Sequence, residues 1–253
     1  MTKSTLVLGA EGYVGSEVSH YLEMKGHHVL RVDNRAYPGL KKSETAVIDH
    51  TAIAGLVDYV SDILIFSGAS SVKLCDEDPA LAWKINVADF CSICKIAAQS
   101  KRKPRIVYAS SSSVYGCVAN KRVSKEEDLL SEPWTPHNAY DVTKFALDAQ
   151  AGILAKRYGI SCLGLRFGTV NGAGAITRVD VMLNAMVEAA ISTGEVQCFN
   201  PRIHRPILGL KDLTRAVLAI VEAESAPQGA SVYNLASFNA QVIDLANAVG
   251  RLT

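Results

Sequence analysis

Apolar positions follow two different periods along this chain. Short apolar runs, rich in β-branched residues, predict buried strands, whereas apolar residues that recur every three or four positions predict helices. The expected strands are residues 5–8, 28–32, 45–48, 62–66, 105–109, 160–166, 196–199 and 232–235. The expected helices are residues 13–25, 52–59, 79–100, 139–158, 181–192, 213–222 and 242–249.

Three glycines stand between the first expected strand and the first expected helix, at Gly9, Gly12 and Gly15. In such a turn the first glycine permits the tight bend, the second admits a pyrophosphate close to the backbone, and the third lets helix pack on strand. The N–H groups and dipole of the helix then face the anion. This arrangement predicts a dinucleotide site.

The second expected strand ends at Asp33, about twenty residues beyond the glycines. A carboxylate at this position accepts both ribose hydroxyls of an adenosine and repels a 2′-phosphate. We therefore expect NAD rather than NADP. Arg35 is the residue that would reverse this preference, by pairing with the phosphate.

Strands and helices alternate as far as residue 166, which predicts an α/β fold with a mostly parallel sheet and helices on both faces. Right-handed crossovers give a doubly wound Rossmann order. The remainder begins with a glycine-rich loop, residues 168–174, and carries a basic loop over residues 200–205. We expect residues 1–168 to form the NAD-binding domain. Residues 169–253 are expected to form a smaller substrate lobe, interleaved with the first.

Bulk composition narrows the class of protein. A net charge of +1 over 253 residues argues against nucleic acid as the main partner. No apolar run reaches about 18 residues, so we expect no membrane span, and the N-terminal stretch reads as a strand rather than a signal peptide. Six scattered cysteines do not form a disulfide framework. These features predict a cytoplasmic protein.

The spacing of the cysteines and histidines bears on redox and metal chemistry. Cys91 and Cys94 form a CxxC inside an expected helix, among apolar residues, and are expected to be buried small hydrophobes. The six histidines include no HxxxH and no HxH pair, so no metal is expected.

Tyr140 and Lys144 are four residues apart on an expected helix and therefore share one face. A nearby ammonium favours the tyrosinate, which can take a proton from an alcohol while a hydride leaves the same carbon. Four serines, residues 110–113, follow the fifth strand at the same edge of the sheet, where one hydroxyl can orient the substrate oxygen. This combination predicts an alcohol oxidation site beside the dinucleotide.

Taken together, these motifs resemble the extended short-chain dehydrogenase/reductase family, in particular its NAD-dependent nucleotide-sugar epimerase/dehydratase branch. The resemblance covers almost the whole chain. Its motifs are the three glycines, Val32-Asp33-Asn34, Asp49, Phe66-Ser67-Gly68-Ala69, Asn86-Val87, Ser110-Ser111-Ser112-Ser113-Val114-Tyr115-Gly116, Tyr140 with Lys144, Leu165-Arg166-Phe167 and Arg205-Pro206.

The resemblance implies a role for each matching residue. Ser111 would be the catalytic serine, Tyr140 the acid/base, and Lys144 the residue that binds the nicotinamide ribose and tunes Tyr140. Asp33 would hold the adenosine ribose and Asp49 would lie by the adenine. Further cofactor contacts are implied for Gly9, Gly12, Tyr13, Val14, Gly15, Asn34, His50, Ser67, Gly68, Ala69, Asn86, Ser110 and Phe167. Substrate contacts are implied for Ser70, Ser111, Ser112, Ser113, Thr169 and Arg205.

Arg205 matches the arginine that meets the diphosphate of the sugar nucleotide in relatives. The alternative is a solvated basic loop with Arg202 and His204. In the family, Phe90, Ile93, Phe145 and Leu147 would lie on helices that pair in a homodimer; the alternative is that they face the sheet.

The chain departs from the family pattern at three points. Dehydratases carry Asp-Glu after the catalytic residue, where this chain has Ser112 and Ser113, so loss of water from C5–C6 is not expected. A frequent asparagine in the substrate site is replaced by Thr169. Relatives also run longer, which implies either a trimmed nucleotide pocket or a shortened version of the family chain, and both alternatives leave the identity of the nucleotide open.

Three functions follow, in order of preference. The first is an epimerase of a nucleotide sugar that holds NAD tightly, oxidises a hydroxyl and returns the hydride to the other face. The second is a dehydrogenase or reductase with the same site and exchangeable NAD. The third is a non-catalytic NAD-binding protein, against which the intact Ser111, Tyr140 and Lys144 weigh.

Overall fold

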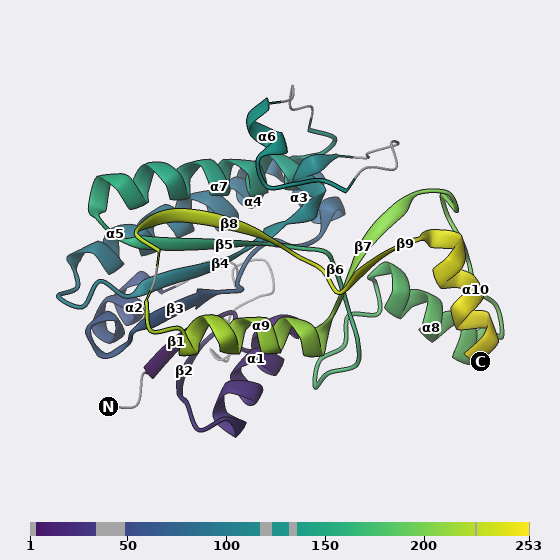
Figure 1. Ribbon diagram of the computed structural model, residues 1–253, viewed down its shortest axis with the longest axis horizontal. Helices are drawn as coiled ribbons and strands as arrows, with labels where there is room; N and C mark the ends of the chain where they lie inside the picture. The colour runs from purple at the N-terminus through teal and green to yellow at the C-terminus, as the bar shows by residue number, and fades with distance from the viewer. Residues whose placement is uncertain (1–3, 34–48, 117–122, 132–135, 226, 253) are drawn as a thin grey trace.

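The computed structural model describes residues 4–33, 49–116, 123–131, 136–225 and 227–252 (Figure 1). Two sheets of unequal size share the chain, and their helices follow the expected α/β pattern. The expected strand 45–48, together with Asn34 and Arg35, lies outside the described residues.

Within the described residues, the larger sheet has six strands, all parallel, in the order β2-β1-β3-β4-β5-β8. Their bounds are β1 Ser4–Leu8, β2 His28–Val32, β3 Asp62–Ile65, β4 Arg105–Ser111, β5 Ser161–Phe167 and β8 Gly229–Leu235. The chain leaves β1 for β2 on one side and then crosses to β3 on the other. The strand order therefore reverses beside β1, and ligands of such sheets bind at that point, beyond the carboxyl ends of the strands.

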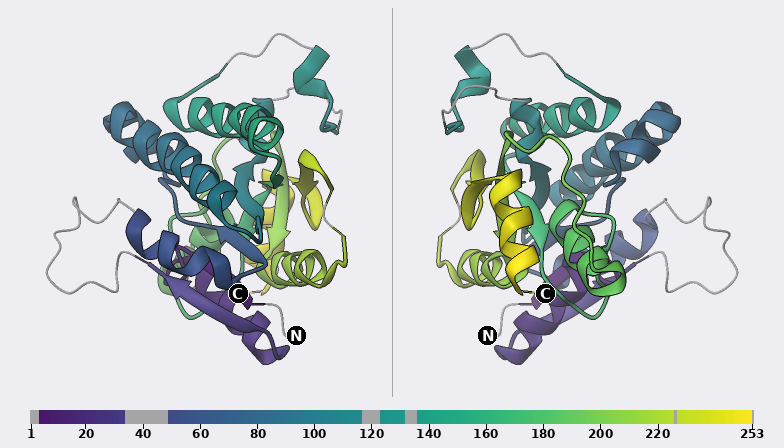
Figure 2. Two further views of the ribbon diagram at one scale, coloured as in Figure 1. Left: turned by 90° about the vertical axis from the view of Figure 1, so that its left-hand side faces the viewer. Right: turned by 90° about the vertical axis from the view of Figure 1, so that its right-hand side faces the viewer.

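Helices cover both faces of this sheet, as the end-on views show (Figure 2). On one face, α1 (Tyr13–Met24) packs against α9 (Leu210–Glu222) over a core that includes Val7 and Leu64. On the other face lie α2 (His50–Leu56), α5 (Asp89–Gln99) and α7 (Ala139–Tyr158). Together with the strand order, this confirms the doubly wound Rossmann architecture.

The smaller sheet, in the order β6-β7-β9, stands at one end of the molecule (Figure 1). Its strands are β6 Thr169–Asn171, β7 His204–Gly209 and β9 Phe238–Gln241, and it adjoins α8 (Met182–Thr193) and α10 (Val242–Leu252). These two helices share a separate apolar core. Between them in sequence, α9 and β8 return to the larger sheet, so segments of the two lobes alternate along the chain; the division at residue 168 stays a prediction.

Helix α7 has the expected bounds because its ends carry strong local signals. The Asn138 side chain accepts a hydrogen bond from Asp141 N at the start, and Gly159 adopts a left-handed conformation, φ 61°, at the end. The expected helix 79–100 is continuous but not uniform. It runs through α4 (Pro79–Trp83), a π-helical turn (Lys84–Ala88) and α5, and the π-turn presents Asn86 to the sheet edge.

Several expectations for the rest of the chain are wrong. Residues 196–199 are not a strand, and the expected basic loop 200–205 gives way at His204 to β7. The expected glycine loop 168–174 contains the short strand β6, and β9 and α3 (Val72–Glu77) were not expected. Strand geometry in β6, β7 and β9 depends on pairing between distant segments, which local periodicity does not register.

Most of the residues predicted to form a dimer interface are buried inside the chain and cannot contact a second copy. Phe90, Ile93 and Leu147 are buried in the core between α5, α7 and the sheet, so the expected dimer contacts through them are wrong. Cys94 belongs to the same core and Cys91 packs against it, and burial raises the pKa of the Cys91 thiol, as expected for structural cysteines. The homodimer itself stays a prediction.

The described residues also bear on membrane insertion and metal binding. None of the helices in these ranges combines the length and the apolar character that a membrane crossing needs. Within the same ranges, no three His, Cys, Asp or Glu side chains gather as a metal site would require.

The remaining short elements complete the described chain. They are the 3-10 turns Val57–Tyr59 and Ser112–Tyr115 and the helix α6 (Asp128–Ser131).

Candidate active site

The glycine turn closes tightly against the ends of β1 and β3. Gly9 has φ 82°, and a Cβ there would lie 2.5 Å from Ser67 N. A Cβ on Gly15 would lie only 2.0 Å from Gly9 O, so α1 meets the turn at a separation that no side chain permits. These two glycines are therefore required by the backbone itself.

The N-terminal end of α1 is open. Its first intrahelical donor is Ser16 N, which bonds Gly12 O, so the N–H groups of Tyr13, Val14 and Gly15 have no acceptor within the helix. Gly12 provides no side-chain cap, and the first turn carries no acidic residue. Three free donors at the positive end of a helix fit a diphosphate.

Asp33 lies directly beside this turn, as the sequence predicts. Its carboxylate accepts a hydrogen bond from Glu11 N at 2.9 Å, which fixes it at the end of β2 next to the glycines. Ser67 lies across the reversal point, and its buried Oγ has no hydrogen-bond partner within the described chain. The open helix end, Asp33 and Ser67 Oγ together fit a dinucleotide such as NAD.

Asp49 caps α2 and His50 is its first residue, and their expected cofactor contacts stay predictions. The Asp49 carboxylate caps α2 by accepting from Thr51 N at 2.9 Å and Ala52 N at 3.2 Å, so the helix begins two residues earlier than predicted. His50 Nε2 lies 3.4 Å from Asp89 Oδ1, and burial raises the pKa of the Asp89 carboxyl. The proposed adenine contact of Asp49 would therefore have to share a carboxylate already engaged by the helix.

Tyr140, Ser111 and Lys144 come together at the carboxyl edge of the sheet. Burial raises the pKa of Tyr140, while a hydrogen bond with the Ser111 side chain and the charge of Arg178 act to lower it. Lys144 Nζ lies 5.7 Å from the centre of the Tyr140 ring. In the protein without NAD, the pKa of Tyr140 is therefore raised, because the effect of burial exceeds that of the neighbouring positive charge. This differs from the expectation that a nearby cation favours the tyrosinate.

Ser111 ends β4 and caps the 3-10 turn that follows it. Its hydroxyl accepts from Ser113 N at 3.2 Å and lies 2.9 Å from Ser113 Oγ. Ser112 and Ser113 are half-buried on that turn. The two positions after Ser111 therefore hold hydroxyls rather than carboxylates, and Ser113 Oγ lies within hydrogen-bond distance of Ser111 Oγ.

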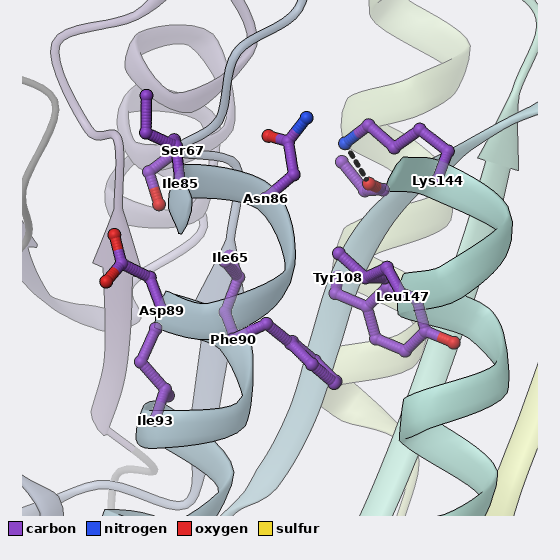
Figure 3. Close-up of a pocket in the computed structure, with 11 residues that line it drawn as sticks. Ile65, Ser67, Ile85, Asn86, Asp89, Phe90, Ile93, Tyr108, Lys144 and Leu147 are labelled. Carbon is purple, nitrogen blue, oxygen red and sulfur yellow. Dashed lines mark hydrogen bonds between the residues drawn. The ribbon is translucent and has the colours of Figure 1, made fainter. Parts of the chain in front are cut away.

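Lys144 lines a pocket beneath the sheet edge, together with Asn86, Ser67 and Asp89 (Figure 3). Its ammonium donates to Ala109 O at 2.8 Å. Asn86, on the π-turn, donates to Ala69 O at 3.0 Å and accepts from Ala69 N at 2.8 Å. Asn86 thereby fixes the turn after β3, and a Cβ on Gly68 would clash with its Oδ1 at 2.9 Å.

Burial lowers the pKa of Lys144 from 10.5 to about 8, although the charge of Asp148 acts to raise it. Between these two values the unfolded chain binds a proton that the folded protein does not, so stability should rise with pH. In NAD-free protein we expect the unfolding free energy of the wild type, relative to Lys144→Met, to rise by about 3 kcal/mol from about pH 8 to about pH 10.5. Denaturant titrations of both proteins across this range measure it; a flat difference would contradict the placement of Lys144.

A buried ion pair supports the site from below. Arg166 Nε donates to Asp148 Oδ2 at 2.9 Å, and Arg166 Nη1 donates to the Tyr115 hydroxyl at 2.6 Å. Asp148 lies one helical turn beyond Lys144 on α7, and Tyr115 belongs to the 3-10 turn after Ser111. One guanidinium therefore joins the helix of Tyr140 to the serine turn.

The remaining predicted substrate residues are spread over both lobes. Phe167 ends β5 and packs on Phe66 with ring centroids 6.3 Å apart. Thr169 begins β6, whereas Arg205 is half-buried on β7, opposite Ala240 of β9. Arg205 thus belongs to a strand rather than the solvated loop that was the alternative; its contact with substrate stays a prediction.

Sequence reasoning missed Arg178, which approaches the site from the smaller lobe. Its Nη1 donates to Ser70 Oγ at 2.9 Å, and Nε and Nη2 pair with Asp180 at 3.0 and 2.6 Å. The contact with Ser70 spans 108 residues of sequence, and no local pattern around Arg178 indicates it.

Comparison with known proteins agrees with this geometry. Residues 5–236 match the family model described as "NAD dependent epimerase/dehydratase family". Among curated proteins, the chain is 32% identical over 187 residues to UDP-glucuronate 4-epimerase 3 of Arabidopsis thaliana, covering 67% of this chain and 43% of that protein. The chain thus spans under half the length of that curated relative.

Solved structures share the fold across the whole chain. The structure of MoeE5 in complex with UDP-glucose and NAD has a TM-score of 0.80 at 24% identity, covering 99% of this chain and 82% of that one. UDP-glucuronic acid 4-epimerase from Bacillus cereus, in complex with UDP-glucuronic acid and NAD, has a TM-score of 0.81 at 19% identity, covering 98% and 82%. At these identities the likeness shows the fold.

Proposed function

The chain belongs to the NAD dependent epimerase/dehydratase family, and from that premise we propose that it is an epimerase of a nucleotide-activated sugar. Membership confirms the resemblance read from the sequence and NAD as the cofactor. The observation that carries the proposal is the meeting of Tyr140, Ser111 and Lys144 beside the glycine turn. The reaction would oxidise one sugar hydroxyl transiently and return the hydride to the opposite face.

In this proposal Tyr140 moves the proton. The phenol oxygen of Tyr140 takes the proton of the sugar hydroxyl. After the oxidised sugar has rotated in the site, Tyr140 returns that proton to the sugar oxygen. Ser111, whose side chain acts to lower the pKa of Tyr140, orients the reacting oxygen. NAD, when bound, supplies the hydride acceptor and donor.

Lys144 is proposed to serve the tyrosine and the ribose. Its ammonium is fixed on Ala109 O and faces the Tyr140 ring, so a positive charge there favours loss of the phenolic proton. Gly9, Gly12, Gly15 and Asp33 would bind the diphosphate and adenosine ribose, as the open helix end and the position of Asp33 beside the glycine turn support.

We propose further that the sugar carries a carboxylate at C6. Arg178 brings a guanidinium close enough to the site for its charge to act on Tyr140, and the serine turn offers the paired hydroxyls of Ser111 and Ser113. A guanidinium with hydroxyl donors is the chemistry that binds a carboxylate. The 32% identity with a UDP-glucuronate 4-epimerase supports the same substrate class.

Replacing Arg178 with methionine is then expected to act on substrate choice. Loss of a charge-assisted contact should lower kcat/KM for UDP-glucuronate by about 10- to 100-fold more than kcat/KM for UDP-glucose, and a loss shared by both sugars reports the hydrogen bond from Arg178 to Ser70. Steady-state rates on both sugars give the ratio. Arg202→Met, an exposed arginine of the smaller lobe, is the matched control; an equal loss on both sugars would assign Arg178 to general structure instead.

A dehydrogenase with exchangeable NAD is the alternative, because it needs the same three residues. Internal recycling of the hydride leaves no net NADH, whereas a dehydrogenase accumulates it in step with product. The dehydratase reaction is disfavoured by Ser112 and Ser113, whose hydroxyls are too weakly acidic to replace a carboxylate pair.

One experiment separates these functions. The purified protein is incubated with UDP-glucuronate and NAD in excess over the sugar nucleotide, and the products are resolved by chromatography, mass and NADH absorbance. The proposal expects a UDP-sugar of unchanged mass and altered retention, without NADH. Stoichiometric NADH would assign a dehydrogenase, a product lighter by one water would assign a dehydratase, and no conversion of any UDP-, dTDP- or GDP-hexose or hexuronate would support the non-catalytic alternative.

A further inference from the structure

Residues 172–180, here called the bridging segment, connect β6 of the smaller lobe to α8. In Figure 1 the chain after β6 descends beside α1, the helix that begins at the glycine turn. Hydrogen bonds join this segment to α1 at one end and to the turn after β3 at the other.

On the α1 side, two contacts hold the segment. The Tyr13 hydroxyl donates to Gly172 O at 2.6 Å, and the Glu17 carboxylate accepts from Ala175 N at 2.7 Å. Both α1 residues belong to the first two turns of the helix, next to its open N-terminal end. Gly174 lies so close that a Cβ there would stand 2.8 Å from Glu17 Oε1.

Asn184 on α8 ties the segment to itself. Its Oδ1 accepts from Gly172 N at 3.1 Å, while its Nδ2 lies 2.9 Å from Arg178 O and 3.3 Å from the Tyr13 hydroxyl. One amide therefore holds both ends of the loop against the α1 anchor. At the far end, Arg178 reaches Ser70 on the turn after β3.

The two anchors lie on opposite sides of the crevice at the reversal of strand order. The glycine turn follows β1 and the Ser67–Ser70 turn follows β3, and Leu8 O bonds both Phe66 N and Ser67 N where they meet. Ligands of this fold bind beyond these strand ends. A segment fixed to α1 on one side and to Ser70 on the other crosses the dinucleotide position.

We propose that the bridging segment retains NAD between turnovers and that Glu17 is the positioning residue that keeps it closed. The inference rests on the proposed function in one respect: an epimerase gains from never releasing its reduced cofactor in mid-cycle. Glu17 needs no contact with NAD for this role. Its carboxylate holds a backbone N–H of the segment, and a charge-assisted hydrogen bond of this kind is strong enough to slow opening by tenfold or more.

The test measures how fast NADH leaves the protein. Wild type and variants are loaded with NADH, an excess of NAD is added, and the decay of bound-NADH fluorescence gives the dissociation rate. Glu17→Ala should raise this rate at least about tenfold. Glu17→Gln keeps an acceptor oxygen and should stay within about threefold of the wild type, because a neutral bond replaces a charged one.

Two further variants separate the hydrogen bond from general damage. Gly174→Ala displaces the Glu17 side chain and should also speed release. Glu23→Ala, on the same helix but paired with Arg31 of β2, removes the same charge away from the segment and should leave the rate unchanged. Alanine is a good helix former, so the glutamate variants should keep the thermal midpoint of the NAD-free protein.

The outcomes discriminate between the two proposals. The retention role is overturned if Glu17→Ala releases NADH at the wild-type rate. It is also overturned if Glu23→Ala speeds release as much as Glu17→Ala does. Both outcomes hold whatever sugar the wild type converts. Faster release in Glu17→Ala and Gly174→Ala, with wild type inactive on every sugar nucleotide, supports retention and overturns the epimerase. Faster release in both variants of an active wild type supports both proposals.

Discussion

Tyr140→Phe should lower kcat by about 10³-fold, because it removes the one phenolic proton that the proposed reaction moves. The ring remains, and so do Lys144 and its bond to Ala109 O, so NAD affinity should change little. Phenylalanine also fits the half-buried position without a new polar group. Rates on UDP-glucuronate and a fluorescence titration with NADH measure the two quantities separately.

Tyr158→Phe is the matched control, at the far end of the same helix. Its activity should equal that of the wild type. Undiminished turnover in Tyr140→Phe would show that another group moves the proton. A parallel loss of NAD binding would instead place Tyr140 in cofactor binding, and would leave the acid/base unidentified.

Gly15→Ala should reduce NAD affinity by at least about 100-fold, because the new Cβ would meet Gly9 O at 2.0 Å and Gly9 C at 2.8 Å. Both are backbone atoms of the turn, so relief requires α1 to move away from it. That movement withdraws the free N–H groups of Tyr13 and Val14 from the diphosphate. Isothermal titration with NAD measures the loss, and circular dichroism reports whether the helices persist.

Gly152→Ala provides the comparison within a helix, since a Cβ there meets no atom within 4 Å. Its NAD affinity should equal that of the wild type, and its stability should rise by up to about 1 kcal/mol from helix propensity. A Gly15→Ala protein that binds NAD normally would mean that the turn is looser than this structure shows.

Local signals explain which parts of the fold were predictable. Helix α7 was placed residue for residue because Asn138 and Gly159 mark its ends, and the six strands of the larger sheet followed from their apolar runs. Strands β6 and β9 could not be predicted from the sequence, because they are three and four residues long and form only by pairing with β7. The false strand at 196–199 shows the converse, an apolar run without a partner in the described chain.

The residues of the candidate site also fall into a predictable and an unpredictable group. The glycines, Asp33, Tyr140 and Lys144 stand in motifs whose spacing carries the chemistry, and the structure brings them to one edge. Arg178, Glu17 and Asn184 stand in no motif. Their contacts join residues 108 to 171 positions apart, so only the folded chain shows them.

The same separation has a consequence for the order in which a growing chain becomes able to hold its cofactor. The glycine turn and the strands beside it are complete once Ile65 has been made, but Gly172, the partner of Tyr13, comes 159 residues after it. The 107 residues from Ile65 to Gly172 take about 5–21 s on the ribosome, at about 5–20 residues per second. During this time the bridging segment does not yet cover the glycine turn. We therefore expect that a nascent chain can bind the cofactor first, and that the segment closes over it once residues 172–180 have been made and folded.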